Sequence, residues 1–181
     1  MKAIADMSPE ELAAYVCQAM ADAGIHVTLT GGACVAIWSN GACQSRDLDF
    51  VEQGLVSRRD LRNVLLELGF AEKHRYFTHP DTDLLIEFPS GPLMVGDQPV
   101  TEVAERRLAT GLLRLLSPTD CVKDRLSAWF HWKDHQSLEQ AVLVAKAQAV
   151  DLAEIRRWAK AEGKLEDFES FESQRKKQRD P

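Results

Sequence analysis

Two short stretches, Thr-Gly-Gly-Ala-Cys at residues 30–34 and Ser-Arg-Asp-Leu-Asp-Phe at residues 45–50, decide how this chain is interpreted. The glycine pair ends an apolar run, and a short apolar segment separates it from the two aspartates. Because the aspartates stand at positions i and i+2 of a predicted strand, their side chains project from one face of it. Such an arrangement raises the question of whether the two carboxylates hold a metal ion.

The composition is that of an ordinary water-soluble globular protein. The chain has 181 residues, of which 45% are hydrophobic and 28% charged, and its net charge is −6. No apolar run approaches the roughly 18 residues of a membrane span, and the N-terminus lacks a long apolar signal core, so we expect a cytoplasmic protein that contacts no membrane. The acidity argues against broad, non-specific binding of nucleic acid. Buried thiols, rather than a zinc site or disulfides, are expected for Cys17, Cys34, Cys43 and Cys121, which show no C-x-x-C pairing.

Helices and strands alternate in the predicted structure of residues 1–115. Ser8 followed by a proline, and Ser57 before a charged turn, each open an amphipathic helix that a glycine ends. Runs rich in β-branched or alternating apolar residues indicate the strands. The predicted strands are 25–30, 47–51, 70–77, 83–88 and a short edge strand at 100–103, with a further short helix at 33–38. This order predicts an α+β fold, a mixed β-sheet flanked by helices.

A C-terminal helical region is predicted from Ser117, where a second cap-plus-proline signature occurs. The expected helices run from Pro118 to about Asp134, from Leu138 to Ala149, from Asp151 onward, and around Leu165–Phe171. The domain boundaries that follow are 1–115 for the α+β core, 116–173 for the helical region and 174–181 for a charged tail.

Three carboxylates are candidates for a metal site. Asp47 and Asp49 would attract a hard divalent cation such as Mg²⁺ or Mn²⁺, although solvated charges on an edge strand are the alternative. Glu87 interrupts the apolar strand 83–88, where an unpartnered buried acid would be costly. Asp83 shares the strand face of Glu87 and could replace it as the third ligand; we prefer Glu87 because Asp83 is nearer the turn.

Gly31 and Gly32 stand between a predicted strand and a predicted helix. A glycine pair there allows the backbone to approach a ligand closely, and exposed N–H groups at a helix start suit phosphate oxygens. A simple tight turn is the alternative. Ser45 would present its hydroxyl on the face of Asp47 if the strand began that early, and could then bind phosphate.

Together, the glycine pair, the serine, the spaced aspartates and the later acid resemble the nucleotidyltransferase fold of the polymerase-beta superfamily. That family carries Gly-Gly or Gly-Ser after the first strand, Asp-x-Asp or Asp-x-Glu on the next, and a third acid on a later strand. The resemblance spans about residues 25–88. It implies metal and catalytic roles for Asp47, Asp49 and Glu87, and nucleotide-binding roles for Gly31, Gly32 and Ser45.

A second stretch, Leu-Ser-Pro-Thr-Asp-Cys-Val-Lys-Asp-Arg-Leu at 116–126 followed by His-Trp-Lys-Asp at 131–134, is similar to the post-core helix of abortive-infection type IV toxin-like nucleotidyltransferases. The resemblance implies that Lys123 meets the triphosphate and that Asp134 orients the nucleotide or the acceptor. On one continuous helix these two residues would share a face.

The sequence therefore predicts an Mg²⁺-dependent or Mn²⁺-dependent enzyme that transfers a nucleoside monophosphate from an NTP, such as ATP, to an acceptor hydroxyl. The acceptor could be RNA, a protein or a small molecule, and the biological context a toxin–antitoxin pair or phage defence. The alternative is a non-catalytic member of the same fold that binds a nucleotide or a protein. The oligomeric state is left open.

Overall fold

A computed structural model describes residues 2–177, and these form two compact units. The first unit comprises the chain up to Cys34 together with Gln44–Leu93 and Thr101–Leu116. The second comprises Val35–Cys43, Met94–Val100 and the chain from Ser117 onward. The units therefore interleave along the chain, because two internal segments join the C-terminal helices.

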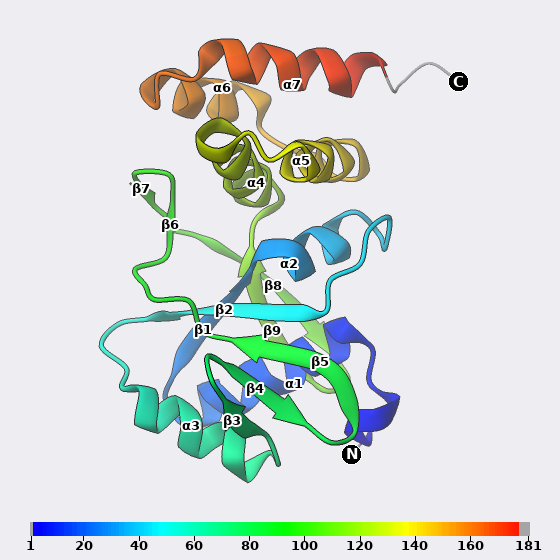
Figure 1. Cartoon of the computed structure of the whole chain (residues 1–181), viewed down its shortest axis with the longest axis vertical. Coiled ribbons are helices and arrows are strands. Elements are labelled where there is room, and N and C mark those ends of the chain that lie inside the picture. Colours follow the sequence, from blue (N-terminus) through cyan, green and yellow to red (C-terminus); the bar gives the residue numbers. More distant parts are fainter. Residues whose placement is uncertain (1, 178–181) are drawn as a thin grey trace. The chain divides into compact units, whose positions relative to one another are not determined.

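Within the described residues, the first unit is built on a seven-stranded mixed sheet with the order β3-β4-β5-β2-β1-β9-β8 (Figure 1). Two of its pairings are parallel, β1 with β9 and β2 with β5, and the others are antiparallel. The strands are β1 (His26–Thr30), β2 (Asp47–Gln53), β3 (Ala71–Lys73), β4 (Tyr76–His79), β5 (Thr82–Glu87), β8 (Val103–Leu108) and β9 (Gly111–Leu116).

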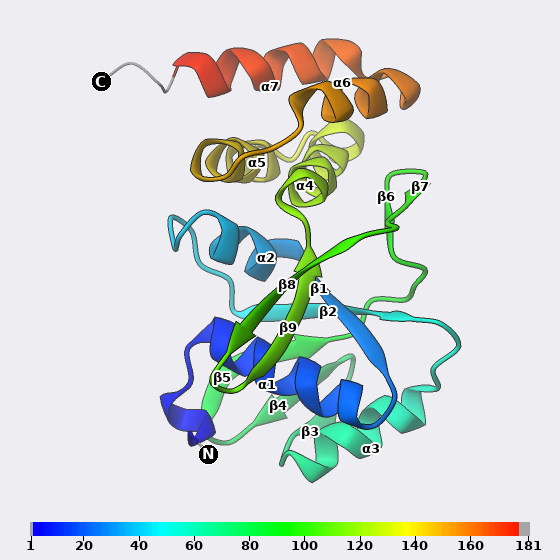
Figure 2. The same ribbon diagram turned by 180° about the vertical axis from the view of Figure 1, so that it is seen from behind.

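Helices α1 (Pro9–Asp22) and α3 (Arg58–Glu67) pack on this sheet and on each other (Figure 2). Ser8 and Glu11 form the predicted capping box at the start of α1, and the Ser57 side chain caps α3. The apolar stripe of α1 is fully buried against β1 and β9. A short 3₁₀ helix, η1 (Ile4–Asp6), precedes α1, and α2 (Gly31–Trp38) follows β1 directly.

The two faces of the sheet differ in chemistry. Phe77, on β4, lies in register with Ile86, which lies in register with Leu48, so these buried side chains share one face. The guanidinium of Arg58, from α3, lies 4.7 Å from the centre of the Phe77 ring, so this is the face that α3 covers. Because side chains alternate along a strand, Asp47 and Asp49 of β2 and Asp83 and Glu87 of β5 lie on the opposite face.

Two strand predictions differ from the structure. The segment predicted as one strand at 70–77 is a hairpin of β3 and β4, because His74 takes a positive φ of 59° and turns the chain. In place of an edge strand at 100–103, the chain forms the hairpin β8–β9, of which β8 is an edge strand and β9 pairs with β1.

In its described part, the second unit contains the four C-terminal helices, the end of α2 from Val35, and the small hairpin of β6 (Met94–Val95) and β7 (Gln98–Pro99). Each of the first three helices has an N-cap side chain, from Ser117, Asp134 and Asp151 in turn. The helices are α4 (Pro118–Trp132), α5 (His135–Ala147), α6 (Leu152–Ala161) and α7 (Leu165–Lys177). The predicted charged tail overlaps α7, in which Arg175 is buried, and its residues 178–181 lie outside the described residues.

The structure confirms the predicted fold class: a mixed sheet flanked by helices, followed in the chain by a helical region. It also confirms buried thiols for Cys17, Cys34 and Cys121, whereas Cys43 is half-buried. No helix in the described part of the chain combines the length and the apolar character needed to cross a membrane.

Candidate functional site

Strand register places the three predicted metal ligands on one face of the sheet. Asp49 lies directly opposite Glu87 in the parallel pair of β2 and β5. Asp47 lies opposite Leu85, which is two residues before Glu87 on β5. All three acidic side chains are half-buried, as expected for residues on the face that α3 leaves uncovered. Asp83 is exposed near the start of β5, two residues before the register partner of Asp47. The register therefore pairs Asp49 with Glu87 rather than with Asp83.

Gly31 brings the start of α2 against the Asp49 carboxylate. Its φ is +63°, a conformation that side chains disfavour. A Cβ built on Gly31 would lie within 3.0 Å of Asp49 Oδ2, closer than real Cβ atoms approach another atom. The glycine is therefore required both by the backbone conformation and by the close approach to the acid.

Gly32 makes the corresponding approach to Ser45. A Cβ at Gly32 would lie 3.1 Å from Ser45 Oγ. The Ser45 hydroxyl donates to the Asp47 carbonyl (2.9 Å) and accepts from the Asp47 N–H (3.2 Å). Since β2 begins at Asp47, Ser45 precedes the strand and fixes its first residue. Strand register and these contacts thus place the six residues predicted in the first unit around the start of α2 and the paired strands β2 and β5.

Arg75, which the sequence analysis did not select, lies beside the candidate acids. Its Nε lies 3.4 Å from Glu87 Oε1, and its guanidinium stacks 4.7 Å from the centre of the Tyr76 ring. A hydrogen bond to Tyr76, followed by the charge of Glu87 and, more weakly, that of Asp47, raises the pKa of Arg75. The one available signal was the arginine itself, but the segment was predicted as a single strand, which gave no reason to place it beside Glu87.

The carboxylates of Asp47, Asp49 and Glu87 provide the oxygen ligands that a hard divalent cation prefers. They lie on one face of the neighbouring strands β2 and β5. The side chains are nevertheless not gathered as ligands: among residues 2–177, no group of three or more His, Cys, Asp and Glu side chains is close enough to hold a metal ion. A cationic guanidinium instead contacts Glu87. The three carboxylates are therefore suitable ligands by their chemistry and their sheet face, but their side chains do not converge on a common point.

Lys123, in the second unit, is already paired. It is only 5% exposed, and its Nζ lies 2.7 Å from both Asp120 Oδ1 and Glu154 Oε1. Burial opposes its charged form, but the hydrogen bonds that Lys123 donates to the two carboxylates outweigh burial and raise the pKa of Lys123. To meet a triphosphate, the ammonium group would have to leave at least one of these acids.

Asp134 does not continue the helix that carries Lys123. Lys133 takes a left-handed conformation, with φ of 52°, and ends α4. The Asp134 carboxylate then caps α5, accepting from the Gln136 N–H at 3.0 Å and from Ser137 Oγ at 2.7 Å. These bonds, led by the one from Ser137, lower the pKa of Asp134. The expectation of a shared face on one continuous helix is therefore wrong.

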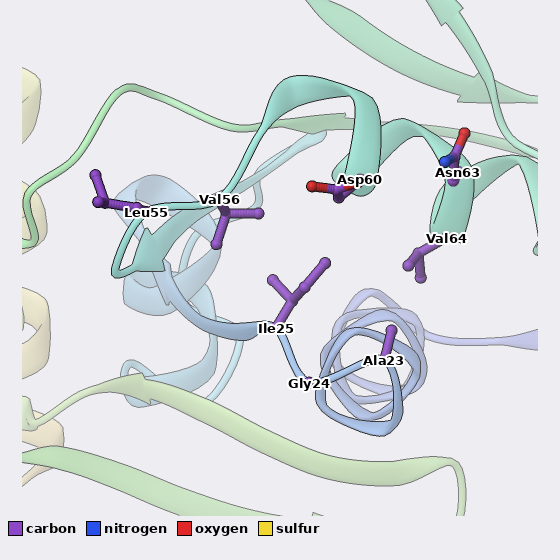
Figure 3. Close-up of a pocket in the computed structure, with 8 residues that line it drawn as sticks. All are labelled: Ala23, Gly24, Ile25, Leu55, Val56, Asp60, Asn63 and Val64. Atoms are coloured by element: carbon purple, nitrogen blue, oxygen red, sulfur yellow. The ribbon is translucent and has the colours of Figure 1, made fainter.

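A cavity of about 370 Å³ opens in the first unit between the end of α1 and the start of α3 (Figure 3). None of the predicted site residues lines it. Its walls carry apolar side chains such as Ile25, Val56 and Val64, with Asp60 and Asn63 on α3.

No protein-family model matches the chain, and no curated protein matches its sequence. Among solved structures it is similar to a solution structure of the antibiotic-resistance factor ANT(2'')-Ia, with 16% identity and a TM-score of 0.46 over 86% of this chain and 95% of that one. It is also similar to a crystal structure of ANT(2'')-Ia in complex with adenylyl-2''-tobramycin, with 15% identity and a TM-score of 0.48 over 92% and 97%. Likeness at this level carries no conclusion about this chain.

Proposed function

We propose that this protein is a metal-dependent nucleotidyltransferase that moves a nucleoside monophosphate from an NTP to an acceptor hydroxyl and releases pyrophosphate. One observation carries the proposal: Asp49 lies in register with Glu87, Asp47 is on the same face, and the glycine turn before α2 abuts Asp49. The same residues carry the sequence resemblance to the polymerase-beta superfamily.

The six residues divide into metal ligands and phosphate-binding groups. Asp47, Asp49 and Glu87 would hold Mg²⁺ or Mn²⁺, which supplies positive charge at the triphosphate and at the leaving group. Glu87 would also accept the proton of the acceptor hydroxyl, whose oxygen attacks the α-phosphorus as the bond to pyrophosphate breaks. The backbone N–H groups at Gly31 and Gly32 bind phosphate oxygens at the start of α2, and the Ser45 hydroxyl contributes beside them.

Transfer of radiolabel from each α-³²P-NTP, with Mg²⁺, to three acceptor pools tests the proposal. The pools are total RNA, lysate protein and tobramycin, which represent the three classes of acceptor. Asp49→Asn should lower transfer by about a hundredfold or more, since metal charge stabilisation is worth several kcal/mol. The matched control is Asp83→Asn, which removes an acid from the same strand face but not from the register pair. Label transfer that is absent with every NTP, or equal in wild type and Asp49→Asn, overturns the proposal.

Nucleotide binding without transfer is the second candidate function. The ion pair of Arg75 with Glu87 favours it, because a guanidinium occupies one carboxylate of the metal set. A binding protein of this kind would retain nucleotide in equilibrium dialysis without releasing pyrophosphate. Pyrophosphate release that depends on Asp49 would exclude it.

The roles proposed for Lys123 and Asp134, and the toxin–antitoxin or phage-defence setting, rest on the resemblance alone. If Lys123 binds the triphosphate, Lys123→Met should weaken NTP binding beyond any loss of stability. If the protein is a toxin, its expression should slow the growth of a bacterial host, and Asp49→Asn should relieve that effect.

A further inference from the structure

The turn between β3 and β4 holds Arg75 in a defined place. Arg58, from α3, donates from Nη2 to the Arg75 carbonyl (3.0 Å) and from Nε to Glu72 (2.9 Å). The same guanidinium lies 4.7 Å from the centre of the Phe77 ring. The backbone of the turn is thus fixed from the α3 face of the sheet.

The side chain of Arg75 lies with the acids on the other face. Tyr76 is the register partner of Glu87 and so shares the face of Asp49. The Arg75 guanidinium stacks on the Tyr76 ring, donates to the Tyr76 hydroxyl and pairs with Glu87. An aromatic platform and an acid therefore hold a cation beside the candidate metal ligands.

This arrangement contributes little to folding. The Arg75 side chain is 69% exposed, and exposed ion pairs stabilise proteins only weakly. A guanidinium has five N–H donors in a planar fork, and the contacts of Arg75 with residues 2–177 use only Nε and Nη2. Donors therefore remain for an anion, and the fork matches phosphate oxygens.

We propose that Arg75 binds the triphosphate of the donor nucleotide and that, in the free protein, its guanidinium occupies the Glu87 carboxylate in place of the metal. The inference rests on the function proposed above. With a metal ion and a triphosphate bound, Glu87 would hold the cation and the Arg75 guanidinium would contact the phosphate oxygens. Arg75 therefore competes with the metal when phosphate is absent and assists binding when it is present.

The two effects of removing Arg75 have opposite signs, which a merely structural residue would not produce. Mn²⁺ binding, followed by electron paramagnetic resonance without phosphate, should become about threefold or more tighter in Arg75→Ala. Binding of inorganic tripolyphosphate with Mg²⁺, measured by calorimetry, should weaken about tenfold or more through loss of a charge-assisted hydrogen-bond pair. Tripolyphosphate serves as the probe because every NTP carries this group.

Arg75→Lys keeps the charge but loses the fork, so tripolyphosphate binding should fall between wild type and Arg75→Ala. Arg59→Ala removes an 80% exposed arginine of α3 and is the matched control, expected to change neither affinity by more than about twofold. Thermal melting checks that each variant is folded.

The outcomes separate this inference from the proposed function. If Asp49→Asn abolishes Mn²⁺ binding while Arg75→Ala binds Mn²⁺ and tripolyphosphate as wild type does, the role of Arg75 is overturned and the metal site stands. An equal loss of tripolyphosphate binding in Arg59→Ala also overturns it, since the effect would then be one of net charge. A wild-type protein that binds neither probe overturns both proposals.

Discussion

Gly31 is the residue on which contact between the start of α2 and the Asp49 carboxylate depends. In Gly31→Ala, the new Cβ meets both a positive φ and the Asp49 oxygen, so something must shift. We expect a loss of about 1–3 kcal/mol in the free energy of unfolding, the range for residues held in unfavourable backbone conformations. Mn²⁺ affinity should fall as well, because the displaced group is a proposed ligand. Urea denaturation and Mn²⁺ titration measure the two effects.

Gly24→Ala is the control for this substitution. Gly24 has a φ of +77°, yet a Cβ there would find no atom within 4 Å. Gly24→Ala should therefore lower the free energy of unfolding by about 1 kcal/mol through backbone strain, without changing Mn²⁺ affinity. Equal Mn²⁺ affinities in the two variants would contradict the role assigned to the Gly31–Asp49 contact.

At the scale of an element, α5 depends on its cap. Asp134→Ala removes the acceptor for the Gln136 N–H and the Ser137 hydroxyl, and should destabilise the protein by about 1 kcal/mol near neutral pH. Because the pKa of Asp134 is lowered from 3.8 in the folded state, this contribution is present above pH 3.8. It is lost as the pH falls through the lower, folded-state pKa.

Denaturation midpoints of wild type and Asp134→Ala between pH 7 and pH 2.5 should therefore converge at the acidic end. Asp134→Asn keeps a capping side chain and should retain most of the stability at pH 7. If Asp134→Asn is as unstable as Asp134→Ala, the cap is not what Asp134 contributes.

The elements that sequence reasoning found are those with local signals. Ser8 and Ser117, each followed by a proline, predict helix starts from interactions within one turn. The structure has both helices, α1 and α4. The hairpin β3–β4 was missed because its turn uses His74 at a positive φ instead of glycine or asparagine. Strand β9 was missed because its leucine run, 111–116, becomes a strand by pairing with β1, far away in the chain.

At the scale of the whole molecule, the candidate site also combines features that local sequence signals reveal with features that depend on long-range contacts. Asp47 and Asp49 could be placed on one face by strand periodicity alone, and Glu87 stood out as an acid in an apolar strand. Their mutual position depends on the parallel pairing of β2 with β5, which is a long-range contact. Arg75 depends on that pairing and on the hairpin as well, so no local pattern could have selected it.

The interleaving of the two units also arises from contacts between residues that are far apart in the sequence. Residues 35–43 and 94–100 belong with the C-terminal helices through tertiary contacts, although they lie within the segment predicted as one core. The β6–β7 turn, for example, is held by a hydrogen bond from the Asp97 N–H to Glu162, 3.0 Å long, at the end of α6. A boundary drawn from composition follows the order of the chain and cannot register such contacts.

The net charge of −6 makes a prediction for the molecule as a whole. An acidic protein repels the phosphate backbone of nucleic acid, so non-specific RNA binding should be weaker than about 100 µM at 150 mM salt, beyond the usual range for such binding. Fluorescence anisotropy with a labelled oligouridylate measures this directly. Micromolar binding with a steep salt dependence would contradict the prediction and reveal a local basic groove. If RNA is nevertheless the acceptor, it must be recognised through a few specific contacts, and label transfer to it should change little between 50 and 200 mM salt, because few counterions would be released.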